Sequence, residues 1–427
     1  MFLNKIPRKE PTIKVGIILP SDKKHQLEIK TPIRMNNEHK ISKYISVKIL
    51  DTGLLINDEY HKDYHINNNS ENLSESIKIL GVPAGRGFHW QKEINARLLG
   101  DIKIYNKNGF IFLINEINIE KYLMSVATSE MSASCPNSLL ESQTIAARSW
   151  NFAAVEKKHE NLDIDVCNDD CCQRYQGVLN ITISSQKACL KTRGMVLMHN
   201  NKICDSRYSK SCGGITESNQ NVWNDKPVDY LQSISDSVEP TKLDLTEEAS
   251  FSKWLDEGTN CFCSPQFVEP NRIKQFIGNV DLSGNYFRWI KKYSQKELVV
   301  LFNSTLNFNI NRISNLVPIK RGNSGRIKEL SIVGHLKNGK KFNKLIKTEY
   351  QIRKIMHKQF LYSSAFSINK DTSENINNPN FLLKGAGWGH GVGLCQIGAL
   401  GMALSNKSSK QILKHYFKNS TLERIYD

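Results

Sequence analysis

Alternating apolar and polar positions dominate the first part of the chain. Residues 12–19 alternate in this way, and short apolar runs follow at Ala96–Leu99 and Ile111–Ile114. A period of two is typical of strands with one buried face. The pair Asn108-Gly109, just before the last run, favours a tight hairpin turn. The pattern therefore predicts a mainly β region over the first hundred residues.

The period changes to that of a helix after this region. Ile119, Leu123 and Val126 recur at steps of four and three, and Glu130 continues the same stripe. This spacing places the four side chains on one face of a helix. A second helix is predicted after Pro136, because apolar and alanine residues recur there at helical spacing and alanine has the highest helix propensity.

The pattern downstream is mixed. Residues 268–366 alternate between helical and strand-like stretches, and a glycine-rich loop at 385–393 precedes a helix of small residues at Leu394–Leu404. The regular strand–helix alternation of a parallel sheet is not seen. We predict an α+β fold with a mainly β N-terminal region, a central helical core, a mixed α/β insert, a Gly-rich loop and a C-terminal helix. The expected domains are 1–100, a core of 101–235 plus 376–427, and an inserted region of 236–375.

Composition limits the class of protein. The 427 residues are 39% hydrophobic and carry a net charge of +16, which allows a buried core and argues against global disorder. The charge suits nucleic acid, anionic lipid or an anionic cell-wall polymer, and a general lysine bias explains it equally well. No apolar run approaches the roughly 20 residues that span a bilayer. Residues 1–19 do not read as a secretory signal.

Glu130 is the most informative single residue. A carboxylate on the apolar stripe of a helix must be paired or partly protonated, because desolvation disfavours its charged form. A partly protonated carboxyl group is what a general acid for glycosidic cleavage requires. The competing interpretation is a structural ion pair, with Arg148 on the next helix as the partner.

A group of cysteines follows the two helices. Cys167, Cys171 and Cys172 lie within six residues, and His159 is eight residues upstream. Structural zinc sites use four cysteine or histidine ligands, so these four residues form a candidate metal site. Free thiols, or a single bridge between Cys167 and Cys172, are the alternatives.

Two glycine-containing segments complete the candidate chemistry. The first runs from Tyr208 to Thr216 and is followed by Trp223, and the second is 387–399, with Trp388, His390 and Gln396. Glycines let the backbone approach a ligand closely. The second segment lacks the Lys-Ser/Thr pair of a phosphate-binding P-loop, which argues against a nucleotide site. The alternative for the first segment is an ordinary loop with Trp223 in the core, and the alternative for the second is a packed structural His390.

These elements together resemble the stage II sporulation protein D family, which includes the amidase enhancers. The resemblance is collinear and rests on Glu120–Leu123, Ser129-Glu130-Met131, Gln143–Arg148, Cys167–Gly177, Gly213–Thr216 with Trp223, and Gly387–Ala399. The clear motifs lie between about residues 116 and 235 and between 381 and 404, with weaker similarity between these stretches.

The resemblance implies a reaction. Members of the family look like lytic transglycosylases, which cleave between N-acetylmuramic acid and N-acetylglucosamine in peptide-free peptidoglycan strands and leave an anhydro-muramic end. Glu130 matches the glutamate that acts as acid and then as base. One carboxylate suffices because the attacking hydroxyl belongs to the substrate, whereas most glycosidases use two. Candidates for binding the sugar and orienting Glu130 are Gln143, Arg148, Gln173, Tyr175, Ser209, His390 and Gln396.

The resemblance also implies a metal. Some members bind zinc through one histidine and two cysteines, and Cys167 and Cys172 match the cysteines. Cys171 stands where a histidine is common, and His159 lies further upstream than the usual ligand. The expected cofactor is a structural zinc held by His159, Cys167, Cys171 and Cys172, with no organic cofactor.

The implied substrate defines the expected setting. We expect peptidoglycan glycan strands and a cell-wall amidase as partners, no nucleic acid, no transmembrane segment, and a location in the cell envelope (periplasm or cell wall). The main alternative is a non-catalytic peptidoglycan-binding protein that stimulates a wall amidase. A zinc hydrolase that uses the cysteine group and His390 is a third hypothesis, which full loss of activity with a chelator but not with Glu130→Gln would support.

Overall fold

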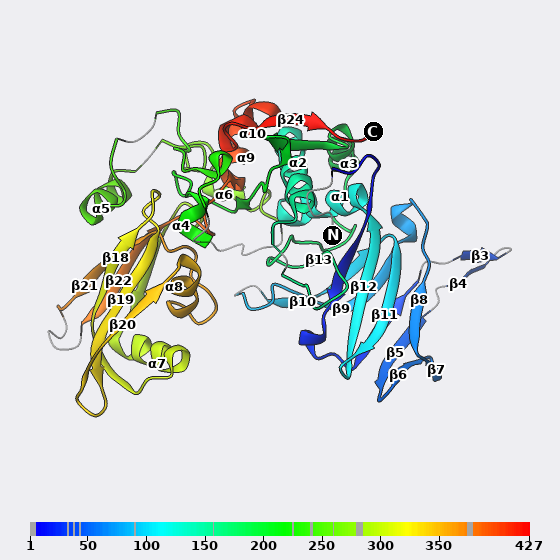
Figure 1. Cartoon of the computed structure of the whole chain (residues 1–427), viewed down its shortest axis with the longest axis horizontal. Coiled ribbons are helices and arrows are strands. Elements are labelled where there is room, and N and C mark those ends of the chain that lie inside the picture. The colour runs from blue at the N-terminus through cyan, green and yellow to red at the C-terminus, as the bar shows by residue number, and fades with distance from the viewer. Residues whose placement is uncertain are drawn as a thin grey trace. The chain divides into compact units, whose positions relative to one another are not determined.

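The chain folds into two compact units. A computed structural model describes residues 6–31, 34–36, 39–41, 44–88, 91–156, 158–223, 226–239, 242–258, 260–278, 285–373 and 379–427 (Figure 1). Unit 1 comprises Met1–Asp205, Lys274–Asp281 and Thr421–Asp427, and unit 2 comprises Ser206–Ile273 and Leu282–Ser420.

Two sheets form the N-terminal part of unit 1 (Figure 1). The first has the order β13-β1-β12-β11-β8, with β1 (Thr12–Ile18), β8 (Asp63–Ile66), β11 (Asp101–Lys107), β12 (Phe110–Asn118) and β13 (Val166–Cys167). The second has the order β10-β9-β2-β5-β6-β7, with β2 (Gln26–Lys30), β5 (Tyr44–Leu50), β6 (Gly53–Ile56), β7 (Glu59–His61), β9 (Ile77–Ala84) and β10 (Lys92–Leu98). A separate hairpin joins β3 (Arg34–Asn36) and β4 (His39–Ile41), and short 3-10 turns lie at Pro20–Asp22 and Leu73–Glu75.

Helices and a small sheet make up the rest of unit 1 as far as the structure describes it. α1 (Ile119–Glu130) follows β12 directly and packs against α2 (Asn137–Ala153) and α3 (Ile183–Lys191). Ten of the twelve α1 residues are buried, because it is enclosed by both helices and by the end of β12. A three-stranded sheet with the order β15-β14-β24 contacts α2 and is built from β14 (Met195–His199), β15 (Lys202–Ile203) and β24 (Thr421–Arg424).

Three small sheets lie in the described part of unit 2. They are β16 (Tyr208–Ser209) with β23 (Leu394–Cys395); β17 (Arg288–Tyr293), β22 (Asn380–Ala386) and β21 (Phe366–Asp371); and β18 (Ile310–Arg321), β19 (Ile327–Leu336) and β20 (Lys341–Lys347). Helices α7 (Gln295–Leu306) and α8 (Glu349–Ile355) pack on the third sheet (Figure 1). Leu298, Phe302 and Ile352 are part of the hydrophobic core there. The other helical segments are α4 (Asn219–Trp223), α5 (Glu248–Glu257), α6 (Pro270–Ile273), α9 (Gln396–Leu404), α10 (Ser409–Tyr416) and a 3-10 turn at Asp229–Leu231.

The predicted α+β class is confirmed. The first hundred residues are mainly strands, and the helices α1 and α2 occur where the spacing places them. The helix expected over Leu394–Leu404 begins two residues later, because Leu394 and Cys395 pair with Tyr208 and Ser209 as parallel strands. The division into three domains stays a prediction, and the structure itself separates into two compact units.

Candidate functional site

Glu130 lies at the end of a helix and inside unit 1. α1 ends there because Met131 is extended, with φ −128° and ψ 163°. Glu130 is only 7% exposed, and its Oε1 accepts a hydrogen bond from the backbone N–H of Arg174 at 3.0 Å. Buried carboxyl groups require such partners. The helical stripe therefore carries Glu130 to a nearly enclosed position in which the orientation of one oxygen is fixed.

Arg174 brings a second carboxyl group near Glu130. Its guanidinium donates a hydrogen bond to Asp170 Oδ1 at 2.7 Å. Burial raises the pKa of Asp170 to about 6; the charge of Arg174 opposes this shift and that of Glu130 adds to it. The sequence analysis did not single out Asp170 and Arg174. Their opposite charges, four residues apart on either side of Cys171 and Cys172, were a signal for an ion pair.

Two of the predicted sugar-binding residues support the loop that carries Arg174. Gln173 is fully buried, and its Oε1 accepts a hydrogen bond from the Tyr122 hydroxyl at 3.1 Å. The Tyr175 hydroxyl donates to Asn115 Oδ1 at 2.8 Å, and its ring stacks on Tyr122 with centroids 5.0 Å apart. These contacts brace the loop, and the predicted contact of Gln173 and Tyr175 with a sugar stays a prediction.

A glycine allows the same loop to touch β10. Gly177 has φ +84°, and a Cβ at this position would lie 2.2 Å from the carbonyl oxygen of Arg97. The Val178 N–H donates to that oxygen at 2.8 Å, and Ser125 of α1 donates its hydroxyl to the Gly177 carbonyl at 2.7 Å. Only glycine fits both the backbone conformation and the close approach.

The pairing considered between Arg148 and Glu130 is wrong. Arg148 is fully buried and donates to both carboxylate oxygens of Glu120, at 2.8 and 2.5 Å. The reason is that Glu120 lies in the first turn of α1, whereas Glu130 lies at its far end. Gln143, also on α2, is fully buried as well. Both side chains are enclosed in the structure, and their contact with a sugar stays a prediction.

A distant segment covers the end of α1. Residues 274–278 belong to unit 1 although the chain on both sides belongs to unit 2. The Phe276 carbonyl accepts hydrogen bonds from the Ser132 N–H at 2.8 Å and from the Cys135 thiol at 3.3 Å. This covering of the Glu130 end of the helix has no signal in the sequence, because the contact is non-local and its acceptor is a backbone carbonyl.

The four predicted metal ligands come together. One ligand atom from each of His159, Cys167, Cys171 and Cys172 lies within 4.8 Å of the others, and Cys171 Sγ is 3.8 Å from His159 Nε2. Hydrogen bonds from Cys167 and Cys172 lower the pKa of the Cys171 thiol, which favours the thiolate that a metal binds. A donor set of three thiols and one imidazole fits a structural zinc.

Backbone pairing fixes the cysteine loop to the first sheets. β13 pairs in parallel with β1, with Cys167 opposite Gly16. The carboxylate of Asp169 accepts hydrogen bonds from the N–H groups of Gly85 and Arg86 at 2.9 and 2.8 Å. The loop that presents Arg174 to Glu130 is therefore anchored at its beginning by the first two sheets and at its end by Gly177.

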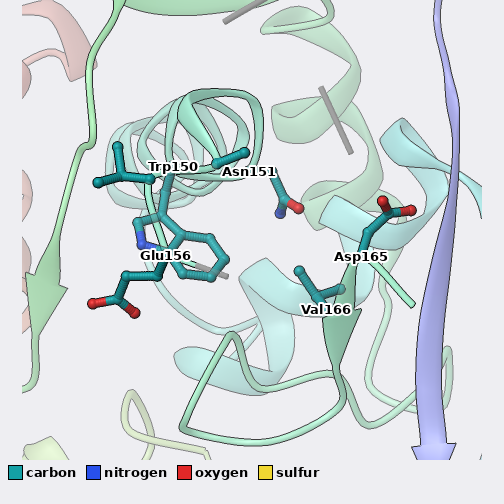
Figure 2. A pocket seen from close by; sticks show the side chains of 7 residues that line it. Trp150, Asn151, Glu156, Asp165 and Val166 are labelled. Atoms are coloured by element: carbon teal, nitrogen blue, oxygen red, sulfur yellow. The ribbon is translucent and has the colours of Figure 1, made fainter. Parts of the chain in front are cut away.

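A small cavity adjoins this loop. Figure 2 shows it between the end of α2 and β13, with Trp150, Asn151, Glu156, Asp165 and Val166 around it. Its volume of about 20 Å³ holds a single water molecule. A sugar ring does not fit into it.

The remaining predicted binding residues belong to unit 2. Ser209 is in β16, beside Cys395 of β23, and is buried together with Gln396. His390 Nδ1 accepts a hydrogen bond from the Val392 N–H at 3.0 Å. Its ring packs edge-on against Trp223, with centroids 5.1 Å apart. The two glycine-containing segments therefore lie together in unit 2. Of Ser209, His390 and Gln396, only His390 is half-buried rather than buried.

Comparisons with known proteins bear on both units. Residues 107–199 match the model of a family described as stage II sporulation protein, and residues 217–393 match a domain of unknown function, DUF8618. An amidase enhancer of Bacillus subtilis (strain 168) is 26% identical over 326 residues, which are 70% of this chain and 40% of that protein. An uncharacterized protein of Brachyspira hyodysenteriae (strain ATCC 49526 / WA1) is 26% identical over 322 residues, 74% of this chain and 70% of that protein.

The predicted resemblance to the stage II sporulation protein family is confirmed for residues 107–199, which match the family model. The matching stretch 107–199 lies in unit 1 and contains Glu130, the paired Asp170 and Arg174, and the four candidate zinc ligands. The chain spans well under half of the amidase enhancer's length. Among the helices that the structure describes, none is long and apolar enough to cross a membrane.

Proposed function

We propose that this chain is a lytic transglycosylase of peptidoglycan that acts on peptide-free glycan strands. The observation that carries the proposal is the enclosed carboxyl group of Glu130, held by the Arg174 N–H within the stretch that matches the family. The match to the family model and the relative named amidase enhancer support the coarser statement of a role in the bacterial cell wall. The location that follows from this substrate is the cell envelope.

In the proposed reaction Glu130 acts twice. Its carboxyl group first protonates the oxygen between N-acetylmuramic acid and N-acetylglucosamine, and the bond from the muramic anomeric carbon to that oxygen breaks. The resulting carboxylate then takes the proton from the muramic primary hydroxyl, whose oxygen bonds to the same carbon. The proton is returned to Glu130, no water is added, and an anhydro-muramic end remains.

The neighbours of Glu130 set its orientation. The Arg174 N–H donates to Oε1 and so orients the carboxyl group that is proposed to face the glycosidic bond. Asp170 fixes the Arg174 side chain, and a zinc ion held by His159, Cys167, Cys171 and Cys172 would stiffen the same loop. In unit 2, Ser209, His390 and Gln396 remain proposed contacts of the glycan.

The test compares wild type with Glu130→Gln on peptide-free glycan strands, followed by mass spectrometry of the products. Wild type is expected to release fragments lighter by one water than hydrolysis products. Loss of a general acid and base is expected to slow release roughly 10²–10⁴-fold. Glu116→Gln, which removes a carboxylate paired with Lys103 at 2.8 Å, is the matched control and should retain full activity. Products of ordinary hydrolysis would contradict the proposal.

The second candidate is a non-catalytic stimulator of a wall amidase. It is favoured by the relative named amidase enhancer. In this case neither wild type nor Glu130→Gln releases fragments, both bind the strands, and adding either protein accelerates a purified wall amidase equally. The same pair of proteins thus separates the two candidates.

A further inference from the structure

A second group of metal-ligating side chains lies in unit 2, outside the stretch that matches the sporulation family. It consists of Cys212, Asp236, Cys263 and Cys395, which are all buried and each place one ligand atom within 4.8 Å of the others. Cys212 Sγ is 3.8 Å from Cys263 Sγ and 3.4 Å from Asp236 Oδ2. Zinc–sulfur bonds of about 2.3 Å in a tetrahedron separate two sulfurs by about 3.8 Å, so the spacing suits a shared ion.

Four separate parts of the chain supply these ligands. Cys395 ends β23 and caps α9, with the Gly398 N–H donating to its sulfur at 3.3 Å. Asp236 follows Ser235, which pairs with Ile215, and Ser237 pairs with Cys261 next to the Cys263 segment. Backbone pairing therefore brings together positions that are up to 183 residues apart, as for Cys212 and Cys395.

Backbone N–H groups are directed at the sulfurs. The Cys212 N–H donates to Cys395 Sγ at 3.1 Å, and the Gly214 N–H donates to Cys212 Sγ at 3.4 Å. Such donors stabilise negative charge on sulfur. They are the outer contacts that thiolate ligands of a metal require.

The carboxylate of Asp236 is oriented in the same way. It is fully buried, and its Oδ1 accepts the Tyr416 hydroxyl at 2.5 Å. This contact leaves Oδ2 on the side of Cys212. A carboxylate enclosed with three thiols costs much free energy without a cation. His415 Nε2 lies 3.6 Å from Asp236 Oδ1, and Arg288, which donates to the Gly213 carbonyl at 2.7 Å, supplies one positive charge beside the group.

We propose that Cys212, Cys263, Cys395 and Asp236 bind a zinc ion in unit 2. Three thiolates and one carboxylate complete a tetrahedron from protein groups alone, and all four are buried, so the site is structural and leaves no position for a substrate. The ion connects the segment after β16, the junction of β23 and α9, the Asp236 segment and the Cys261–Cys263 segment. The proposal does not depend on glycan cleavage.

A neighbouring thiol provides the matched control. Cys261 Sγ lies 3.7 Å from Cys263 Sγ but is outside the group of four. We would purify full-length protein with zinc and measure metal per chain by mass spectrometry. Cys263→Ser and Cys395→Ser are expected to lose one zinc ion per chain, and Cys261→Ser none. Cys171→Ser reports separately on the site in unit 1.

Cobalt binding keeps the test valid if a variant folds poorly. In the Cys171→Ser/Cys172→Ser background, Co²⁺ is expected to produce a sulfur-to-cobalt absorption band that saturates at one equivalent, and Zn²⁺ should abolish it. Absence of this band, or an unchanged metal content in Cys212→Ser, Cys263→Ser and Cys395→Ser, would overturn the proposal. So would intact mass showing a Cys212–Cys263 disulfide in the metal-loaded protein, because that bond removes two of the ligands.

Discussion

At the scale of single residues, the ion pair between Glu120 and Arg148 is buried inside unit 1. Glu120 also accepts hydrogen bonds from the Tyr426 hydroxyl at 2.7 Å and the Gly194 N–H at 3.3 Å. The pair thereby connects α1, α2 and the C-terminal segment. A fully satisfied network of this kind specifies one arrangement of the elements it joins.

Removing Glu120 is predicted to destabilise unit 1 strongly. Glu120→Ala leaves the Arg148 guanidinium buried without its counter-ion, which costs about 3–5 kcal/mol. Urea unfolding followed by circular dichroism measures the change. Asp163→Asn is the control, because Asp163 is 81% exposed in its pair with Lys14, and exposed pairs contribute less than about 1 kcal/mol. Equal effects of both substitutions would contradict this view of the buried pair.

Buried thiols give a second residue-scale prediction. Burial raises the pKa of Cys189 to about 11 and that of Cys204 to about 12. Only the thiolate is nucleophilic, so both groups stay protonated at neutral pH and should resist iodoacetamide in the folded protein. Their modification is expected to increase as the pH rises toward these values. Peptide mapping against a urea-unfolded control measures it, and rapid labelling of Cys189 at pH 7 would refute the prediction.

At the scale of elements, α9 is positioned by its small residues. A Cβ at Gly401 would lie 2.0 Å from the Phe262 carbonyl oxygen, so the helix touches the Cys261–Cys263 segment backbone to backbone. Alanine is favoured over glycine inside a helix by about 1 kcal/mol. Overpacking against a fixed backbone atom costs about 1–3 kcal/mol, and we expect this cost to prevail.

Gly401→Ala is therefore predicted to lower the stability of unit 2 and to weaken zinc retention there. Thermal unfolding and metal content after dialysis against a chelator measure the two effects. Ala399→Gly, which changes helix propensity without adding volume, serves as the comparison and should lower stability while leaving the metal content unchanged. A more stable Gly401→Ala protein would show that the carbonyl oxygen moves aside.

Local patterns predicted the elements better than their partners. The steps along Ile119, Leu123 and Val126 predicted α1 and the buried side of Glu130, because helical geometry is set by neighbours in sequence. They could not predict that Arg148 pairs with Glu120, since the packing of α2 on α1 decides between two acidic residues of one helix. The sequence could not predict the group of Cys212, Asp236, Cys263 and Cys395, because its members are far apart in the chain and are brought together by pairing between distant strands.

At the scale of the whole molecule, the charge remains unbalanced. The sequence has 58 basic and 42 acidic residues and a net charge of +16. Each ion pair inside the fold neutralises one positive and one negative charge, so ion pairing leaves the net charge of +16 unchanged. A proposed wall substrate carrying anionic polymers would be attracted over distances set by the Debye length, about 10 Å at 0.1 M salt and 3 Å at 1 M.

Binding to such walls is therefore predicted to weaken with salt. We expect at least about a tenfold loss of affinity for sacculi that carry anionic polymers between 0.1 and 1 M NaCl, because screening removes the long-range attraction. Sedimentation of the Glu130→Gln protein with sacculi measures binding without cleavage. Neutral chitin oligosaccharides are the control, since contacts with uncharged sugars do not depend on screening. Equal salt dependence for both ligands would mean that salt acts on the fold, and a salt-independent affinity for sacculi would assign recognition to the sugar contacts alone.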